Sequence, residues 1–263
     1  MKILRPNLGL SFLIPVILLS LPAHATEQQW LSLFNGEDLT GWTPKLRGYP
    51  LGEDPWQTFR VADGLLTVSY DRYEDFDNRF GHLFYKTPYS HYRLRLQYRF
   101  IGEQAPAGEA WAFRNSGVML HSQPPDTMPA EQNFPISIEA QFLGGRGDGK
   151  HRPTANMCSP GTHIVFQGEF TETHCVPADA PTIDGDEWVD FEVLVQGDEY
   201  VAHFVNGEKV IEYGGLTTGG GVVDGYLPEM KPEGKPLKSG YISLQSESHP
   251  IQFRNIELLQ LDP

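Results

Sequence analysis

Polar residues alternate with apolar residues in two segments of the sequence, Ile136–Phe142 and Tyr241–His249. Alternate positions of a β-strand point to the same face, so each segment gathers its polar side chains on one side. The first contributes Ser137, Glu139 and Gln141. The second contributes Gln245, Glu247 and His249. Carboxylates beside amide, hydroxyl and imidazole groups can form one wall of a sugar-binding cleft. Either row can instead be the solvent-exposed face of a sheet.

Proton transfer is the chemistry that these residue types suit best. Glu139 is the first candidate for a catalytic base, with a purely structural carboxylate as its alternative. His249 is the leading candidate for an acid or an oxyanion stabiliser, because imidazole can donate a proton near neutral pH. His163 is a second candidate, and His121 ranks below it. Glu247 can act with Glu139 only if their strands are neighbours in the sheet.

Other polar and aromatic residues are candidates for substrate binding. Asn115 and Ser116 can hydrogen-bond sugar hydroxyls, and Arg114 can bind a carbonyl oxygen, although an Asn-Ser-Gly turn without a ligand explains the same residues. Trp111 and Trp56 fall in loop-like segments, where an indole ring can stack on a sugar. Gln141 and Gln245 complete the predicted binding set.

The N-terminus has the features of a secretory signal peptide over residues 1–25. Lys2 and Arg5 precede the apolar run Leu8–Leu21, and Ala23-His24-Ala25 is a typical cleavage site. The apolar run is short for a membrane span. We therefore expect a periplasmic or secreted protein without a membrane anchor.

The net charge limits the class of partner. The chain has 20 basic and 34 acidic residues, a formal net charge of −14. Nucleic acids and anionic membrane surfaces are bound through basic patches, so this composition argues against both. A neutral or cationic ligand such as a carbohydrate fits better.

The two cysteines, Cys158 and Cys175, are expected to pair, because disulfides persist outside the cytoplasm. Closing a loop of this length stabilises a protein by about 3 kcal/mol in the chain-entropy model. The alternative is a zinc site completed by His163 or His174, but the spacing fits no standard zinc pattern.

No metal is assigned from the sequence. Glu139, Glu247, His163 and His249 could hold a divalent ion that polarises a carbonyl group. Oxygen atoms of the segment Asp184–Glu187 could hold a structural calcium. Neither set has a diagnostic spacing.

The periodicity predicts an all-β chain forming one domain over residues 26–263. Asp63-Gly64 and Asn206-Gly207 separate apolar runs and are strong hairpin signals. Two Gly- and Pro-rich segments, 144–161 and 214–239, are expected to be loops. The predicted strands are Phe59–Val68, Gly81–Lys86, Tyr92–Phe100, Gly117–His121, Ile136–Phe142, His163–Phe170, Trp188–Gln196, Tyr200–Val205, Lys209–Tyr213, Gly240–Gln245 and Ile251–Leu261.

An ordered set of short motifs resembles the exported family called DUF1080 or 3-keto-disaccharide hydrolases. The motifs span the predicted mature chain: Leu33–Trp42, Phe59–Val68, Asn115–Val118, the strand around Glu139, Asp186–Trp188, His203–Gly207, Gly240–Gln245, His249-Pro250 and Phe253–Ile256. The resemblance implies a concanavalin A-like jelly-roll β-sandwich of two curved antiparallel sheets, with a carbohydrate site on the concave face. It also implies action on glycosides whose sugar carries a ketone at carbon 3.

The resemblance implies an unusual route of cleavage. A ketone at carbon 3 acidifies the hydrogen on carbon 2, so a base can remove it, and the enolate then expels the group on carbon 1. Related sandwich enzymes place two carboxylates at alternate positions of one strand, whereas this chain has Glu139 followed by Gln141. Two alternatives stay open: a lectin-like module without activity, and a conventional glycosidase that uses Glu139 and Glu247.

Overall fold

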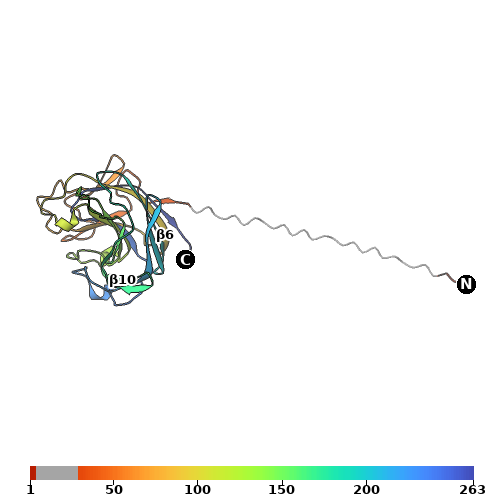
Figure 1. Cartoon of the computed structure of the whole chain (residues 1–263). Coiled ribbons are helices and arrows are strands. Elements are labelled where there is room, and N and C mark those ends of the chain that lie inside the picture. The colour runs from red at the N-terminus through yellow and green to blue at the C-terminus, as the bar shows by residue number, and fades with distance from the viewer. Residues whose placement is uncertain (4–28) are drawn as a thin grey trace.

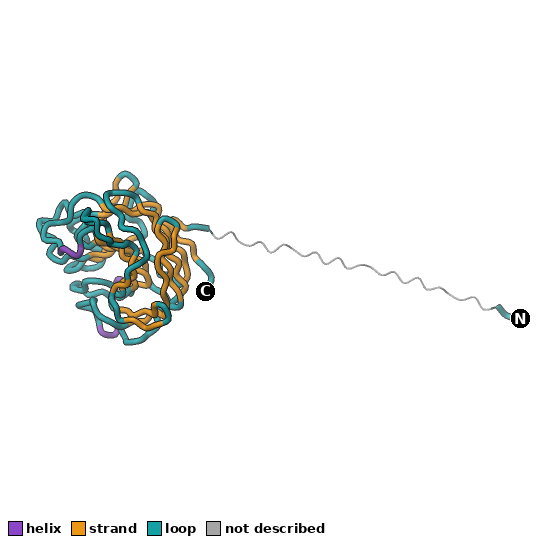
Figure 2. Tube along the Cα trace, in the orientation of Figure 1, coloured by secondary structure: helices purple, strands orange, loops and turns teal. Residues whose placement is uncertain are grey.

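The computed structural model describes residues 1–3 and 29–263. Most of the predicted signal peptide, residues 1–25, therefore lies outside the described residues. The described chain forms two antiparallel sheets that face each other, with long loops on the side away from β6 (Figures 1 and 2). Within this part of the chain, no helix is long and apolar enough to cross a membrane.

The larger sheet has ten strands. In spatial order they are β11 (Glu169–Thr171), β10 (Thr162–Phe166), β15 (Glu208–Thr218), β14 (Tyr200–Val205), β13 (Val189–Gln196), β6 (His91–Phe100), β17 (Ile251–Gln260), β4 (Leu65–Val68) and β3 (Phe59–Ala62), with β1 (Leu31–Ser32) paired to β17.

The smaller sheet has seven strands. In spatial order they are β12 (Cys175–Val176), β9 (Asn156–Cys158), β8 (Ile138–Leu143), β7 (Asn115–Ser122), β16 (Tyr241–Ser246), β5 (Gly81–Tyr85) and β2 (Trp42–Leu46). Three short 3₁₀ helices lie in the loops: η1 (Ala110–Ala112), η2 (Pro125–Thr127) and η3 (Pro228–Met230). Because β7 separates β8 from β16, the two polar rows expected from the sequence flank one common strand.

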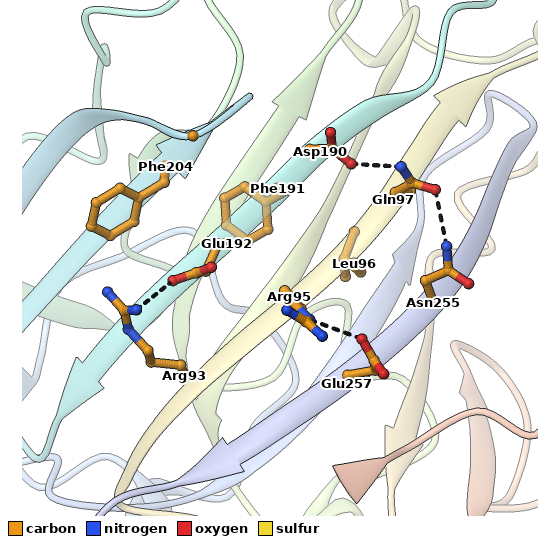
Figure 3. A pocket seen from close by; sticks show the side chains of 11 residues that line it. Arg93, Arg95, Leu96, Gln97, Asp190, Phe191, Glu192, Phe204, Asn255 and Glu257 are labelled. Carbon is orange, nitrogen blue, oxygen red and sulfur yellow. Dashed lines mark hydrogen bonds and ion pairs between the residues drawn. The ribbon is translucent and has the colours of Figure 1, made fainter. Parts of the chain in front are cut away.

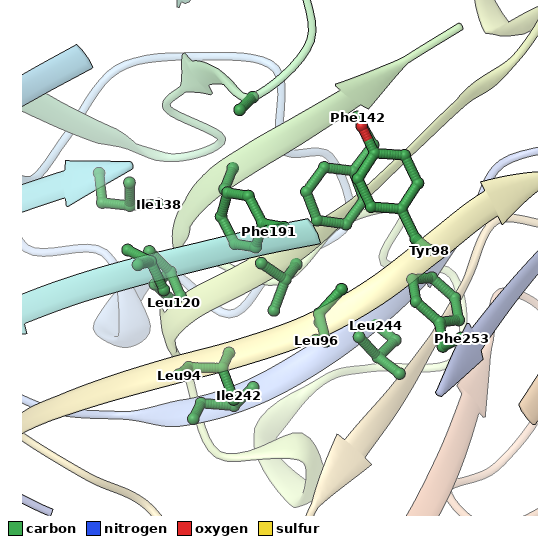
Figure 4. Packing of buried hydrophobic residues seen from close by; sticks show 14 of the residues in the cluster. Leu94, Leu96, Tyr98, Leu120, Ile138, Phe142, Phe191, Ile242, Leu244 and Phe253 are labelled. Carbon is green, nitrogen blue, oxygen red and sulfur yellow. The ribbon is translucent and has the colours of Figure 1, made fainter. Parts of the chain in front are cut away.

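The core lies between the sheets, where each strand contributes its alternate apolar positions (Figure 4). Tyr98 of β6 stacks on Phe142 of β8 with ring centroids 4.0 Å apart. Burial of each large side chain stabilises the folded state by about 1.5–3 kcal/mol. The apolar faces of the two sheets therefore pack against each other. The polar residues between these apolar positions must therefore point away from the core.

Most of the predicted strands, and both hairpins, are confirmed. Asp63, Gly64, Asn206 and Gly207 all have positive φ, the conformation of a two-residue turn between antiparallel strands.

The prediction that two long segments are loops is partly wrong. The segment 144–161 contains β9, and β15 continues to Thr218. Strand β9 is short and pairs with β8 and with β12, so its conformation depends on tertiary contacts rather than on a local pattern. The predicted strand His163–Phe170 is instead two strands, β10 and β11, that turn at Gln167 and Gly168. Strand β2 was missed because Pro44 interrupts its pattern, which is tolerated on an edge strand.

Candidate active site

The outer face of the smaller sheet carries a polar surface. Glu139 pairs in register with Met119, and Gln141 pairs with Gly117. On the next strands, Gln245 lies opposite His82. These side chains alternate with core residues along each strand, so they share the face that points away from the larger sheet. This face is covered by loops, because most of its polar side chains are buried.

A cavity of about 740 Å³ opens on this face. Glu139 and Glu247 both line it, together with Gln141, Asn115 and Trp111, so the structure brings five of the predicted site residues together. Its remaining lining residues are Arg47, Asn78, Phe80, Glu109, Asn133, Phe134, Pro160, His174, Cys175, Val222 and Asp224. Trp111 is half exposed and stacks on Phe80 with ring centroids 6.1 Å apart, which leaves indole surface available to a ring in the cavity.

The two carboxyl groups form a buried, interacting pair. Glu139 is 6% exposed and Glu247 is 3% exposed. Burial raises the pKa of Glu139 from 4.5 to about 8. Burial and the nearby charge of Glu139 together hold the pKa of Glu247 well above its usual range. Like charges in one dry site cannot both ionise easily, so the pair retains a proton at neutral pH.

Unpartnered polar atoms mark this face of the sheet. Glu139 Oε1, Glu247 Oε2 and Asn115 Oδ1 are buried and hydrogen-bond to no other described residue. The same holds for both amide atoms of Gln245 and for His82 Nε2. Buried polar groups in folded proteins are normally satisfied. The concentration of these atoms around the carboxyl pair therefore favours a site that binds a polar ligand.

A second hollow, of about 590 Å³, lies on the outer face of the larger sheet (Figure 3). Its polar groups bind one another: Arg95 pairs with Glu257 at 2.8 Å, and Arg93 with Glu192 at 3.3 Å. Because its charges are paired and partly exposed, this hollow resembles an ordinary solvated sheet face, and its described lining residues include no buried acid like those of the first cavity.

Gly117 makes room for the carboxylate of Glu139. A Cβ atom at Gly117 would lie 2.7 Å from Glu139 Oε1 and 2.9 Å from the backbone oxygen of Ala140. The side chain of Glu139 therefore extends over Gly117 of β7, toward the strand that leads to Glu247. No role for this glycine was predicted from the sequence.

The amide of Gln141 has a fixed orientation. Asn156 Nδ2 donates to Gln141 Oε1 at 3.1 Å, and Asn156 Oδ1 accepts a hydrogen bond from the backbone N–H of Ala178. The second bond fixes which end of the Asn156 amide donates. Gln141 must then offer its NH₂ group to other partners, which makes it a hydrogen-bond donor at the cavity.

His174 was considered from the sequence only as a zinc ligand, yet it lines the cavity. It precedes Cys175, which forms the predicted disulfide with Cys158. Burial lowers the pKa of His174, so the ring is neutral at pH 7. Its proximity to the carboxyl pair depends on the pairing of β9 with β12, which no local sequence pattern indicates.

His249 and His163 do not line the cavity. β16 ends at Ser246, and Ser248 has a φ of 91°, so the alternation that placed His249 beside Glu247 ends before it is reached. The His249 ring packs against Phe100 and Phe113 instead. His163 lies on β10 of the larger sheet, where it pairs with Glu233 at 3.4 Å.

Three predicted binding residues also lie elsewhere. Ser116 shares the core-facing side of β7, and its hydroxyl donates to the backbone oxygen of Gln245 at 2.9 Å. Arg114 bonds to the backbone oxygen of Gly185 and to Asp186. Gln245 faces the outer side but is fully buried and does not line the cavity.

The candidate metal ligands are not clustered. Among the described residues, the only group of three potential ligand side chains within 4.8 Å of one another is Cys158, His174 and Cys175. Both sulfurs of that group form the disulfide, so it is not a thiolate site. Asp186 in the expected calcium segment pairs with Arg114.

The fold and the covered sheet face define an all-β sandwich of the jelly-roll type that carbohydrate-binding proteins and glycosidases share. Two proteins of Parabacteroides distasonis ATCC 8503, each described as a putative glycosyl hydrolase, superpose with a TM-score of 0.53. They are 19% and 21% identical over 89% of this chain and 100% and 95% of theirs. The laminarinase of Rhodothermus marinus has a TM-score of 0.50 and 9% identity, over 89% of this chain and 97% of its own.

A family described as the 3-keto-alpha-glucoside-1,2-lyase-like domain matches residues 29–259. The chain belongs to this family, as its ordered motifs indicated. No curated protein matches the sequence. At these identities the solved structures establish the fold, and the chemistry rests on the residues of the cavity.

Proposed function

We propose that the protein cleaves 3-keto-glycosides by elimination of the group on carbon 1, followed by hydration. The observation that carries the proposal is the buried pair Glu139–Glu247, which retains a proton in a cavity large enough for a sugar. Elimination needs a base and an acid at once, and a carboxyl pair in which Glu139 is ionised and Glu247 is protonated supplies both.

Glu139 loses its proton before Glu247, because the charge of Glu139 helps to hold the pKa of Glu247 well above its usual range. In the elimination step, this ionised form of Glu139, populated as the pH approaches about 8, removes the hydrogen on carbon 2. The electron pair forms the carbon 1–carbon 2 double bond as the bond from carbon 1 to the leaving oxygen breaks. The protonated Glu247 gives its proton to that oxygen. The products are a free alcohol or sugar and a 3-keto sugar unsaturated between carbons 1 and 2.

In the hydration step, the protons return. Glu247, now ionised, removes a proton from water, and the hydroxide adds to carbon 1. The proton on Glu139, which lines the open cavity, exchanges with water while the unsaturated sugar is bound, and Glu139 then gives a solvent-derived proton to carbon 2. The pair thus regains its starting protonation state, and the net reaction is hydrolysis.

The remaining groups of the cavity stabilise the negative charge on the ketone oxygen. The Gln141 amide is held by Asn156 with its NH₂ group free to donate, as an oxyanion-hole donor must be. His174 is neutral and lines the same cavity, so it can offer a second donor. Asn115 and Trp111 contact the other faces of the sugar in this proposal.

Export is part of the proposal. The disulfide Cys158–Cys175 is typical of oxidising compartments, and the N-terminal sequence has the features of a cleavable signal. Both observations support a periplasmic or secreted enzyme.

The test compares a 3-keto-disaccharide with its unoxidised parent, using wild type and Glu139→Gln. We expect cleavage of the keto substrate alone and its loss in the variant. Cleavage of the parent sugar would instead support a conventional glycosidase using both carboxylates. Sugar binding without turnover of either substrate would support a lectin-like module.

A further inference from the structure

We propose that the cavity continues into a second subsite, built around Trp56, that binds the second ring of a neutral disaccharide. This inference rests on the proposed function, because it assigns where the leaving group of that reaction lies. It adds a specificity-determining residue that is remote from the carboxyl pair.

The second subsite is a hollow of about 400 Å³ that adjoins the first cavity. Asn78 and Glu109 line both spaces, so they form a shared boundary. Glu109 comes directly before η1, which carries Trp111. A ligand stacked on Trp111 therefore extends past Glu109 and Asn78 into the hollow if it has a second ring.

Trp56 is held in place on one wall of this hollow. Its indole N–H donates to the Tyr49 hydroxyl at 3.1 Å, and its ring lies 5.3 Å from that of Tyr73. The Arg79 guanidinium lies 5.0 Å from the ring centroid and is fixed by Asp77 at 3.0 Å and by the Asp75 backbone oxygen at 2.7 Å. An immobilised indole beside a guanidinium offers a stacking surface and donors for a sugar ring at little entropic cost.

The charges around the hollow select for a neutral ring. Among the described residues that line it, four carry carboxylates, and Arg79, which is already paired, is the only cation. Carboxylates accept hydrogen bonds from hydroxyl groups but repel phosphate, sulfate and uronate groups. The second ring is therefore an uncharged sugar rather than an anionic leaving group.

The experiment compares a 3-keto-disaccharide with the methyl glycoside of the same 3-keto sugar, which lacks a second ring. We measure kcat/KM for the disaccharide divided by kcat/KM for the methyl glycoside, in wild type and in Trp56→Ala. Loss of a stacking contact that only the second ring makes should lower this ratio by about fivefold to tenfold in Trp56→Ala. Trp30→Ala is the matched control, because Trp30 packs on Arg95 of the larger sheet, and it should leave the ratio unchanged.

Glu109→Ala is a second variant, which tests the same subsite if Trp56→Ala does not fold. Its side chain is exposed, and we expect the ratio to fall by at least twofold with an unchanged Tm. Dissociation constants of both ligands in Glu139→Gln, with and without Trp56→Ala, measure the same preference without turnover. Turnover of both substrates with an unaltered ratio in both variants would overturn the subsite alone. Absence of both turnover and binding would overturn the proposed function as well.

Discussion

Replacing Gly117 with alanine tests whether the position of the Glu139 carboxylate matters. The new Cβ would lie 2.7 Å from Glu139 Oε1, whereas ordinary contacts begin near 3.4 Å. The carboxylate must therefore retreat by about 0.7 Å. The backbone oxygen of Ala140 is also only 2.9 Å away, so part of the strain falls on the pairing of β7 with β8.

Two magnitudes follow from this geometry. Misplacing a reacting group by about 1 Å can cost on the order of 100-fold in rate, so Gly117→Ala should lower kcat by about 10- to 100-fold. Inserting a methyl group into a filled site costs about 1–3 kcal/mol of unfolding free energy. The variant should thus remain folded while it loses most of its activity.

The assay combines steady-state kinetics on a 3-keto-disaccharide with thermal unfolding of the same preparations. Gly221→Ala is the control, because a Cβ at Gly221 meets no atom within 4 Å, and it should keep wild-type kcat and Tm. If Gly117→Ala folds and keeps the wild-type kcat, the reasoning is refuted, because catalysis would then not depend on the position of the Glu139 carboxylate.

Four further predictions concern the same cavity. Gln141→Ala should lower kcat by about 100- to 1000-fold in steady-state assays, the usual cost of losing one oxyanion donor. Asn156→Asp should act in the same direction, because it removes the amide that orients Gln141. Burial raises the folded-state pKa of Glu139 to about 8, so the folded protein binds more protons than the unfolded chain. Stability should therefore fall as pH rises from about 4.5 to about 8, by up to about 1.4 kcal/mol per pH unit for each carboxyl. Thermal unfolding should show this fall, and Glu139→Gln should reduce it. Replacing Cys158 and Cys175 together with alanine should lower the unfolding free energy by about 3 kcal/mol in denaturant titrations.

The strand pattern predicted an all-β sandwich because most strands alternate apolar and polar positions, and two sheets packed face to face bury the apolar faces together. The jelly-roll arrangement itself was implied by the family resemblance. The same alternation predicted which face Glu139 and Gln141 share. It failed for His249, because the alternation holds only while the chain is extended and the strand ends at Ser246. Ser116 was predicted to bind sugar hydroxyls from the Asn-Ser-Gly motif alone, and it lies on the core-facing side of its strand.

Other parts of the site depend on contacts between distant segments. The register of β7 against β8 places Gly117 beside Glu139, and a long connection joins these strands instead of a short hairpin turn that would set the register locally. His174 reaches the cavity through the pairing of β12 with β9 and the disulfide, 17 residues apart in sequence. The orientation of the Gln141 amide depends on Asn156 in the same way.

The central claim is that cleavage passes through removal of the hydrogen on carbon 2. The most direct measurement is turnover of a 3-keto-disaccharide in D₂O, followed by analysis of the released 3-keto sugar for deuterium at carbon 2. Elimination and hydration predict one solvent-derived deuterium in the product made by wild type, and no product with Glu139→Gln. Cleavage that leaves the original hydrogen on carbon 2 would contradict the account, because the bond to carbon 1 would then break without the enolate.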